Sequence, residues 1–159
     1  MTSLEDRDTF IARYGPLFEH SPWVAQRAAT MLPFSSLHAG LMKVVHDATP
    51  EEQLALIRAH PELAGKAAVD GGLTEASAAE QASAGLDQLS QEEFDRFHAL
   101  NAAYNEKFGF PFIICVRLTN KAGILAAMES RLSNDRDTEI ATAIEQIGEI
   151  VRLRLEMVL

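Results

Sequence analysis

The chain has 159 residues, of which 47% are hydrophobic and 23% charged, so one folded domain over residues 1–159 is expected rather than a disordered segment. Its formal net charge of −9 argues against binding to nucleic acid, which requires clustered basic residues. The single cysteine, Cys115, excludes an intrachain disulfide and a cysteine-rich zinc motif, as suits a reducing compartment.

Capping residues predict two short helices near the amino terminus. Ser3 and Asp6 have the spacing of a capping box, with Asp in place of the usual Glu, and predict a helix over 3–15. Ser21 is then expected to cap a helix that has Pro22 in its first position, where proline is favoured.

Two further helices are predicted in the next part of the chain. Ser36 precedes apolar residues at helical spacing. Thr49 and Pro50 combine a cap with a proline at the first helical position. The second of these helices should end at His60, because Pro61 disfavours helical geometry in the residue before it.

The middle of the chain predicts another pair of helices. An alanine-rich helix is expected to begin at Thr74 or Ser77 and to extend through Leu89. Ser90 begins a capping box for the following helix, which should end near Gly109, where glycine can take the left-handed conformation of a helix end.

The segment 110–116 is apolar and rich in β-branched residues, so that a buried strand is conceivable. No second run of similar strength offers it a partner, and we expect a buried irregular segment near 109–118, either an extended loop or a distorted helical turn. Asn120 caps the next helix, and Asp135 or Asp137 caps a long final one. The predicted fold class is all-α, a single compact multi-helix domain.

The sequence predicts a cytoplasmic protein that does not contact a membrane. No stretch approaches the roughly twenty apolar residues that span a bilayer. The first residues are acidic, unlike a signal peptide, and the last three are not a peroxisomal tripeptide of the Ser-Lys-Leu type.

His60 is the first candidate for chemistry. Pro61 restricts its backbone, and a rigid histidine can aim its imidazole at one face of a substrate. Imidazole titrates near neutrality and can both accept and donate protons, and the carboxyl end of a helix is expected to favour its charged form. The alternative is a histidine that caps the helix by bonding to a carbonyl group.

Ser77, Glu80 and Gln81 form the second candidate group, because positions i, i+3 and i+4 share one face of a helix. A hydroxyl, a carboxylate and an amide together can bind a ligand that is rich in N–H and C=O groups. The alternative is an ordinary solvated helix face.

Arg154 is the third candidate, because it interrupts an apolar stripe on the final helix. The stripe follows 4-3-4-3-4 spacing and comprises Ile140, Ile144, Ile147, Val151, Arg154 and Val158. A guanidinium on a buried face must be paired, and its geometry suits a carboxylate. Arg154 is therefore expected to bind an anion, to form an internal ion pair, or to extend its head group to water.

The irregular segment is the fourth candidate, since its backbone N–H and C=O groups could face a ligand from an apolar wall. The alternative is ordinary core. Cys115 within it is expected to be structural, because a reactive thiol needs exposed and electropositive surroundings.

Three motifs together resemble the 2-oxo-4-hydroxy-4-carboxy-5-ureidoimidazoline (OHCU) decarboxylase family, and the resemblance covers nearly the whole chain. The motifs are His60-Pro61-Glu62-Leu63-Ala64-Gly65-Lys66, Ser77-x-x-Glu80-Gln81 and Asn105-Glu106-Lys107-Phe108-Gly109-Phe110-Pro111-Phe112-Ile113-Ile114-Cys115. The resemblance implies an all-helical, homodimeric enzyme without a metal or organic cofactor. It also implies that the enzyme converts OHCU to (S)-allantoin and CO2 in urate breakdown.

The same resemblance implies roles for individual residues. His60 falls on the catalytic histidine, which the catalytic glutamate, Glu80, would polarise, and Arg154 falls on the arginine that binds a carboxylate. The implied substrate contacts are Pro61, Ser77, Glu80, Gln81, Phe112, Ile113, Ile114, Cys115, Val116 and Arg154. No metal ligand is implied.

Two other classes of function remain open at this point. A thiol enzyme would use Cys115 as its nucleophile and would lose activity in a Cys115→Ser variant, which a decarboxylase would tolerate. A helical ureide-binding or dimerisation module would bind allantoin-like molecules without turnover.

Overall fold

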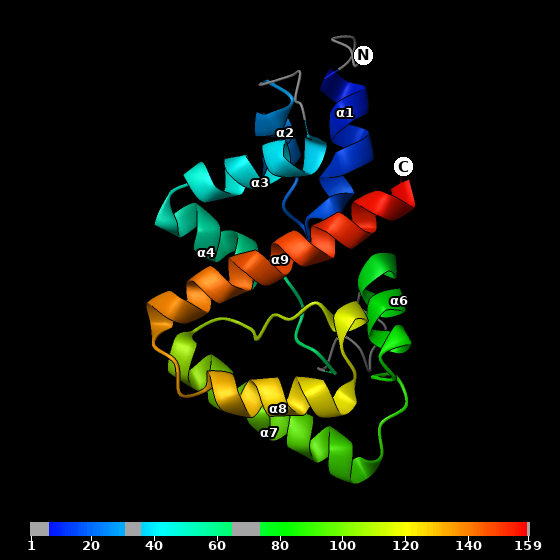
Figure 1. Cartoon of the computed structure of the whole chain (residues 1–159), viewed down its shortest axis with the longest axis vertical. Helices are drawn as coiled ribbons and strands as arrows, with labels where there is room; N and C mark the ends of the chain where they lie inside the picture. The colour runs from blue at the N-terminus through cyan, green and yellow to red at the C-terminus, as the bar shows by residue number, and fades with distance from the viewer. Residues whose placement is uncertain (1–6, 31–35, 65–73, 159) are drawn as a thin grey trace.

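The computed structural model describes residues 7–30, 36–64 and 74–158. None of these residues lies in a β-strand, and most lie in helices, which confirms the all-α prediction. The longest helix, α9 (Arg136–Val158), crosses the middle of the molecule and separates two groups of helices (Figure 1).

The amino-terminal elements form the group on one side of α9. They are α1 (Arg7–Tyr14), the 3-10 helix η1 (Gly15–Leu17), α2 (Trp23–Ala28), α3 (Leu37–Asp47) and α4 (Pro50–Arg58). Both α3 and α4 pack against α9. This packing buries the inward face of α9 and brings the end of α4 close to the centre of the molecule.

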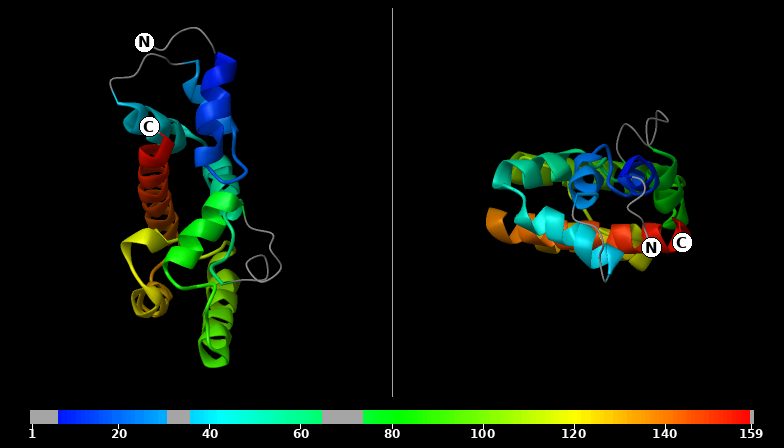
Figure 2. Two further views of the ribbon diagram at one scale, coloured as in Figure 1. Left: turned by 90° about the vertical axis from the view of Figure 1, so that its right-hand side faces the viewer. Right: turned by 90° about the horizontal axis from the view of Figure 1, so that it is seen from above.

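The second group lies at the other end of the elongated molecule (Figures 1 and 2). It contains α6 (Glu75–Ser83), α7 (Gln91–Phe108), the 3-10 helix η2 (Val116–Leu118) and α8 (Lys121–Arg131). α7 packs on α8, and α6 packs on η2. Within the described residues, no helix combines the length and the hydropathy that crossing a bilayer requires.

Five predicted caps are confirmed by a hydrogen bond from a backbone N–H near the helix start to the capping side chain. They are Ser36, Thr49, Ser90, Asn120 and Asp135. Such bonds satisfy N–H groups that have no partner within the helix. The predicted Ser3 cap lies outside the described residues.

The structure also defines two helix starts that the sequence did not. For α6 the sequence left two capping residues open, and for α2 it predicted the wrong one. Thr74 rather than Ser77 caps α6, and the Ser77 N–H donates to its hydroxyl oxygen. The prediction for α2 was wrong by one residue, since Pro22 itself occupies the N-cap position. The Ser21 hydroxyl donates instead to the carbonyl of Glu19 and so stabilises the turn before the helix.

The prediction that α6 extends to Leu89 was also wrong, since the helix ends at Ser83. Gly85 has a φ of +80°, a left-handed conformation that costs glycine little. The Leu86 N–H donates back to the Gln81 carbonyl at 2.9 Å, which is one bond of the Schellman motif that closes many helices.

The segment between α7 and η2 is a buried extended loop, as predicted. α7 ends at Gly109, which has a φ of +80°. Beyond it, Phe110, Phe112, Ile113 and Cys115 are all buried, although none lies in a regular element. The loop thus belongs to the core while its backbone remains free of helical hydrogen bonds.

Polar side chains anchor this loop on both sides. Arg131 of α8 donates to the Ile113 carbonyl at 2.8 Å, and the Cys115 N–H donates to Gln146 of α9 at 2.9 Å. Arg131 is paired in turn with Glu139 at 2.8 Å, and Glu139 is fully buried. A buried ion pair therefore fixes the loop between α8 and α9.

Candidate active site

His60 lies two residues beyond the end of α4 and is 7% exposed. Its backbone N–H donates to the Ile57 carbonyl at 3.2 Å and completes the helix end. Its ring atom Nε2 is buried and has no hydrogen-bond partner among the described residues. The ring is thus not used to cap the helix there, and a ligand could take up this nitrogen.

Burial determines the protonation of His60. Removal from water lowers the pKa of its imidazole to about 4; the Glu19 carboxylate opposes this change, while Arg154 and His20 reinforce it. The prediction that the charged ring is favoured is therefore wrong, because desolvation has the largest effect on this pKa and lowers it. At neutral pH the ring is neutral and can act first as a proton acceptor.

Gln81 holds the loop that follows the histidine. Its Oε1 accepts from the Ala64 N–H at 3.0 Å, and its Nε2 donates to the Glu62 carbonyl at 3.4 Å. Asn101 of α7 donates to the Leu63 carbonyl at 2.8 Å. Ala64 has a φ of +54°, which a residue other than glycine rarely adopts without support from its surroundings. Both ends of the Gln81 amide thus bond to the protein itself.

Arg154 is 6% exposed, so the prediction that it lies on the buried face of α9 is confirmed. Its Nε and Nη2 donate to the two oxygens of Glu80, both at 2.8 Å, and Nη2 also donates to Glu19 at 2.9 Å. Further bonds run from Nη2 to the Ser77 hydroxyl and from Nη1 to the Leu17 carbonyl. The internal ion pair considered for this residue is therefore present, with two carboxylates.

Glu19 is a component of the site that the sequence did not indicate. It lies in the turn between η1 and α2, next to His20, whose φ is +47°. Burial alone would raise the pKa of Glu19, but hydrogen bonds from Ser77, Thr74 and Arg154 hold it below its ordinary value. Its second oxygen, Oε2, is buried and has no hydrogen-bond partner among the described residues.

Glu80 contacts Arg154 rather than His60. Both of its oxygens accept hydrogen bonds from Arg154, and no hydrogen bond joins it to His60 in the described structure. The carboxylate whose charge acts on the imidazole is that of Glu19. Direct polarisation of His60 by Glu80, as the sequence resemblance implied, is not observed.

His60, Glu80, Gln81 and Arg154 meet at one cavity that is open to solvent. Every residue proposed from the sequence lines it, namely His60, Pro61, Ser77, Glu80, Gln81, Phe112, Ile113, Ile114, Cys115, Val116 and Arg154. Sequence reasoning did not single out four other lining residues, which are Leu63, Arg117, Ile150 and Leu153. Segments far apart in the chain thus converge on a single hollow.

The extended loop forms the apolar wall of this cavity. Ile114 lines the cavity, and among the described residues its backbone N–H and C=O have no hydrogen-bond partner. Burial raises the pKa of the Cys115 thiol, which disfavours the reactive thiolate and agrees with a structural role. Nowhere in the described residues do three His, Cys, Asp or Glu side chains gather to hold a metal ion.

The OHCU decarboxylase family model matches residues 3–156. The chain belongs to the OHCU decarboxylase family. The shared length includes α4, α6, the extended loop and nearly all of α9, which are the elements that supply the cavity.

Similarities to individual proteins are consistent with membership of this family. The chain is 45% identical over 153 residues to the OHCU decarboxylase of Haloferax volcanii, covering 94% of this chain and 89% of the relative. It is 41% identical to that of Halalkalicoccus jeotgali, covering 95% and 85%. A solved (S)-allantoin synthase superposes with a TM-score of 0.74 at 27% identity, covering 98% of this chain and 51% of the solved chain, so the present chain spans about half of that protein.

Proposed function

We propose that this member of the OHCU decarboxylase family removes CO2 from OHCU to give (S)-allantoin in urate degradation. The observation that carries the proposal is the convergence of His60, Glu80 and Arg154 on one cavity. Family membership indicates the substrate. The cavity contains an acid/base group, charged groups and an apolar wall with unpaired backbone groups.

The reaction requires proton transfer and a place for an electron pair. When the bond to the carboxylate carbon breaks, CO2 leaves and its bonding pair enters the neighbouring unsaturated ring. The 4-hydroxyl then loses its proton as a carbonyl forms, and the carbon that carries the ureido group gains one. The ring nitrogen that received the electron pair takes a further proton from water, which gives neutral allantoin. The substrate ring itself accepts the electron pair, so the protein has to bind and orient the substrate and to move a proton.

His60 is the residue that we propose for the proton transfers. Its neutral ring can accept the proton of the 4-hydroxyl and deliver a proton to the neighbouring carbon from one side. Delivery from one fixed side yields one enantiomer. Its unpartnered Nε2 agrees with this role.

The remaining lining groups are proposed to hold the substrate. Arg154 keeps Glu80 and Ser77 in place, and no more than one N–H, on Nη1, remains for a contact with the substrate. The free N–H and C=O of Ile114 match the ureido group, which has both donors and acceptors. The apolar wall limits access of water to the leaving carboxylate.

Circular dichroism of the product tests the proposed activity. OHCU decays spontaneously to racemic allantoin, so the enzyme should give faster formation of one enantiomer. Racemic product at the uncatalysed rate would refute the proposal and would favour a ureide-binding module instead.

His60→Asn tests the assignment of the histidine. Asparagine keeps a polar side chain of similar size but cannot transfer protons, and kcat should fall by about 10²–10⁴-fold. The far-ultraviolet spectrum and the melting temperature confirm that the variant folds. Near-normal turnover in a folded variant would remove His60 from the mechanism.

Three further properties are proposed, the domain extent from the length of the chain, the assembly from the family resemblance and the location from the sequence of the two termini. The chain is expected to form one domain over residues 1–159, to assemble as a homodimer and to act in the cytoplasm. Analytical ultracentrifugation measures the assembly, and a monomer at micromolar concentration would contradict it.

A further inference from the structure

The hydrogen bonds of Arg154 leave it little capacity for a substrate carboxylate. A guanidinium has five N–H donors. The single N–H of Nε and those of Nη2 are taken by Glu80, Glu19 and Ser77, and Nη1 also donates to a carbonyl. At most one N–H therefore remains, which is too few for a paired, two-bond contact with a carboxylate.

The charge at the cavity leads to the same conclusion. Arg154 carries one positive charge, while Glu19 and Glu80, both bonded to it, carry two negative charges. His60 is neutral near pH 7. Without another cation, an anionic substrate would meet a cluster with a net charge of −1.

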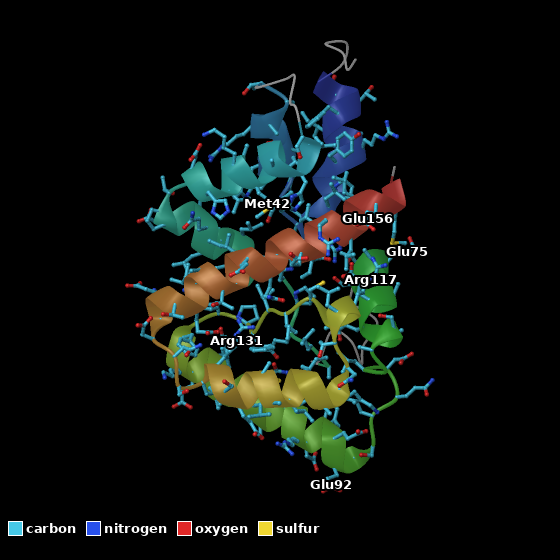
Figure 3. All side chains as sticks on the ribbon, viewed as in Figure 1. Met42, Glu75, Glu92, Arg117, Arg131 and Glu156 are labelled. Atoms are coloured by element: carbon cyan, nitrogen blue, oxygen red, sulfur yellow. The ribbon has the colours of Figure 1, made fainter. Side chains whose placement is uncertain are left out.

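Arg117 supplies the missing charge. It lies in η2, directly after the extended loop, and among the described residues it is the one cation other than Arg154 that lines the cavity. Figure 3 shows it beside α6, near the carboxyl-terminal part of α9. It also lines an adjoining hollow shared with Glu80 and Arg154, and so lies where the two hollows meet.

Arg117 has no carboxylate partner in the described structure, although Arg152 on the nearby helix α9 has two, Glu149 and Glu156. Its one hydrogen bond through the guanidinium runs from Nη1 to the sulfur of Met157 at 3.6 Å, and a thioether is a weak acceptor. The side chain is exposed, so it can change partner at little cost.

We propose that Arg117 is a substrate-binding and specificity-determining residue, which draws the carboxylate of the substrate to the mouth of the cavity. This inference rests on the proposed function. In the transition state, negative charge moves from the carboxylate into the ring as neutral CO2 forms. A contact at the exposed mouth is screened by water, so it favours entry and orientation without strongly holding the group that must lose its charge.

Kinetics of Arg117→Gln test the proposal. Loss of a charge-assisted contact should raise KM for OHCU about tenfold, with kcat within about twofold of the wild type. Arg117→Lys should keep most of the effect. Arg152→Gln is the control for net charge, because it removes an arginine from α9 that does not line the cavity, and it should leave KM unchanged.

Dependence on salt provides a second measurement. The kcat/KM of the wild type should fall as ionic strength rises, while that of Arg117→Gln should vary less. An unchanged KM in Arg117→Gln, or equal changes in Arg117→Gln and Arg152→Gln, would overturn the proposal.

Direct binding separates this inference from the proposed function. Titration calorimetry with allantoate, an anionic ureide, and with (S)-allantoin, a neutral one, requires no turnover. Arg117→Gln should weaken the binding of allantoate about tenfold and leave that of allantoin within twofold. If the wild type and Arg117→Gln bind allantoate equally well, or if neither binds it, the inference is overturned. If the wild type binds these ligands but does not turn over OHCU, only the proposed function is refuted.

Discussion

Arg154 bonds to two carboxylates that should differ sharply in their contribution to stability. Glu19 is 2% exposed, and its Oε1 accepts hydrogen bonds from Thr74, Ser77 and Arg154. The side chain of Glu80 is 14% exposed and bonds only to Arg154. We predict that Glu19→Ala destabilises the fold considerably more than Glu80→Ala.

The magnitude follows from the donors that each change leaves without a partner. Glu19→Ala removes the acceptor of the Ser77 hydroxyl and of one Arg154 N–H, both buried, and of the half-buried Thr74 hydroxyl. Each buried unpaired group costs about 1–3 kcal/mol. Because Glu80 still neutralises Arg154, the loss of stability should be about 3–5 kcal/mol. Glu80→Ala frees N–H groups that water in the cavity can reach, so about 1–2 kcal/mol is expected.

Urea denaturation followed by circular dichroism at pH 7 measures both free energies of unfolding. The dependence on pH supplies a second check, because the pKa of Glu19 is lowered in the folded state. Its stabilising effect is present above the ordinary carboxyl pKa and is lost as the pH falls through the folded value. Glu19→Gln should remove that loss. Equal destabilisation by Glu19→Ala and Glu80→Ala would refute the reasoning.

Three other measurements test the site. Because the pKa of His60 is lowered to about 4, kcat/KM should be level from neutral pH downward and fall only near pH 4; a fall centred near the ordinary histidine pKa would contradict the burial argument. Cys115→Ser should keep activity within about twofold, because its thiol is buried and its pKa raised, and inactivation would favour a thiol enzyme. Arg131→Met frees the Ile113 carbonyl and leaves Glu139 buried without its charged partner. It should therefore raise KM and lower the free energy of unfolding, measured in urea, by about 3–5 kcal/mol. An unchanged KM would show that the extended loop needs no anchor from α8.

Local sequence signals were sufficient for most helix starts and for the burial of Arg154. A cap such as Thr49 acts on N–H groups within its own first turn, so a few residues contain all the information. The apolar stripe of α9 placed Arg154 on the inward face in the same way, because helical periodicity is a local property. The end of α6 also had a local signal, Gly85, which the prediction through Leu89 overlooked.

Glu19 and the pKa of His60 could not be obtained in this way. Glu19 lies in a turn without periodicity, and it is buried only because α6 and α9 bring Ser77, Thr74 and Arg154 around it. The helix dipole expected at His60 is a local effect, whereas the desolvation that lowers the pKa of its imidazole comes from the whole fold. Tertiary packing therefore set both the second carboxylate of the site and the protonation of its histidine.

The buried polar atoms without partners belong to a residue of the cavity or to residues that bond to its lining. In the described residues they are Glu19 Oε2, His60 Nε2, Asn101 Oδ1 and Arg131 Nη2. His60 lines the cavity, and Glu19 bonds to Arg154, which also lines it. The other two residues hold backbone carbonyls of cavity-lining residues, since Asn101 bonds to Leu63 and Arg131 to Ile113. Unpaired buried atoms lower stability wherever they occur. The unpaired Nε2 of His60, which lines the cavity, is expected where a fold keeps a polar group ready for a ligand. Binding of a ureide should therefore raise the melting temperature of the wild type more than that of His60→Asn.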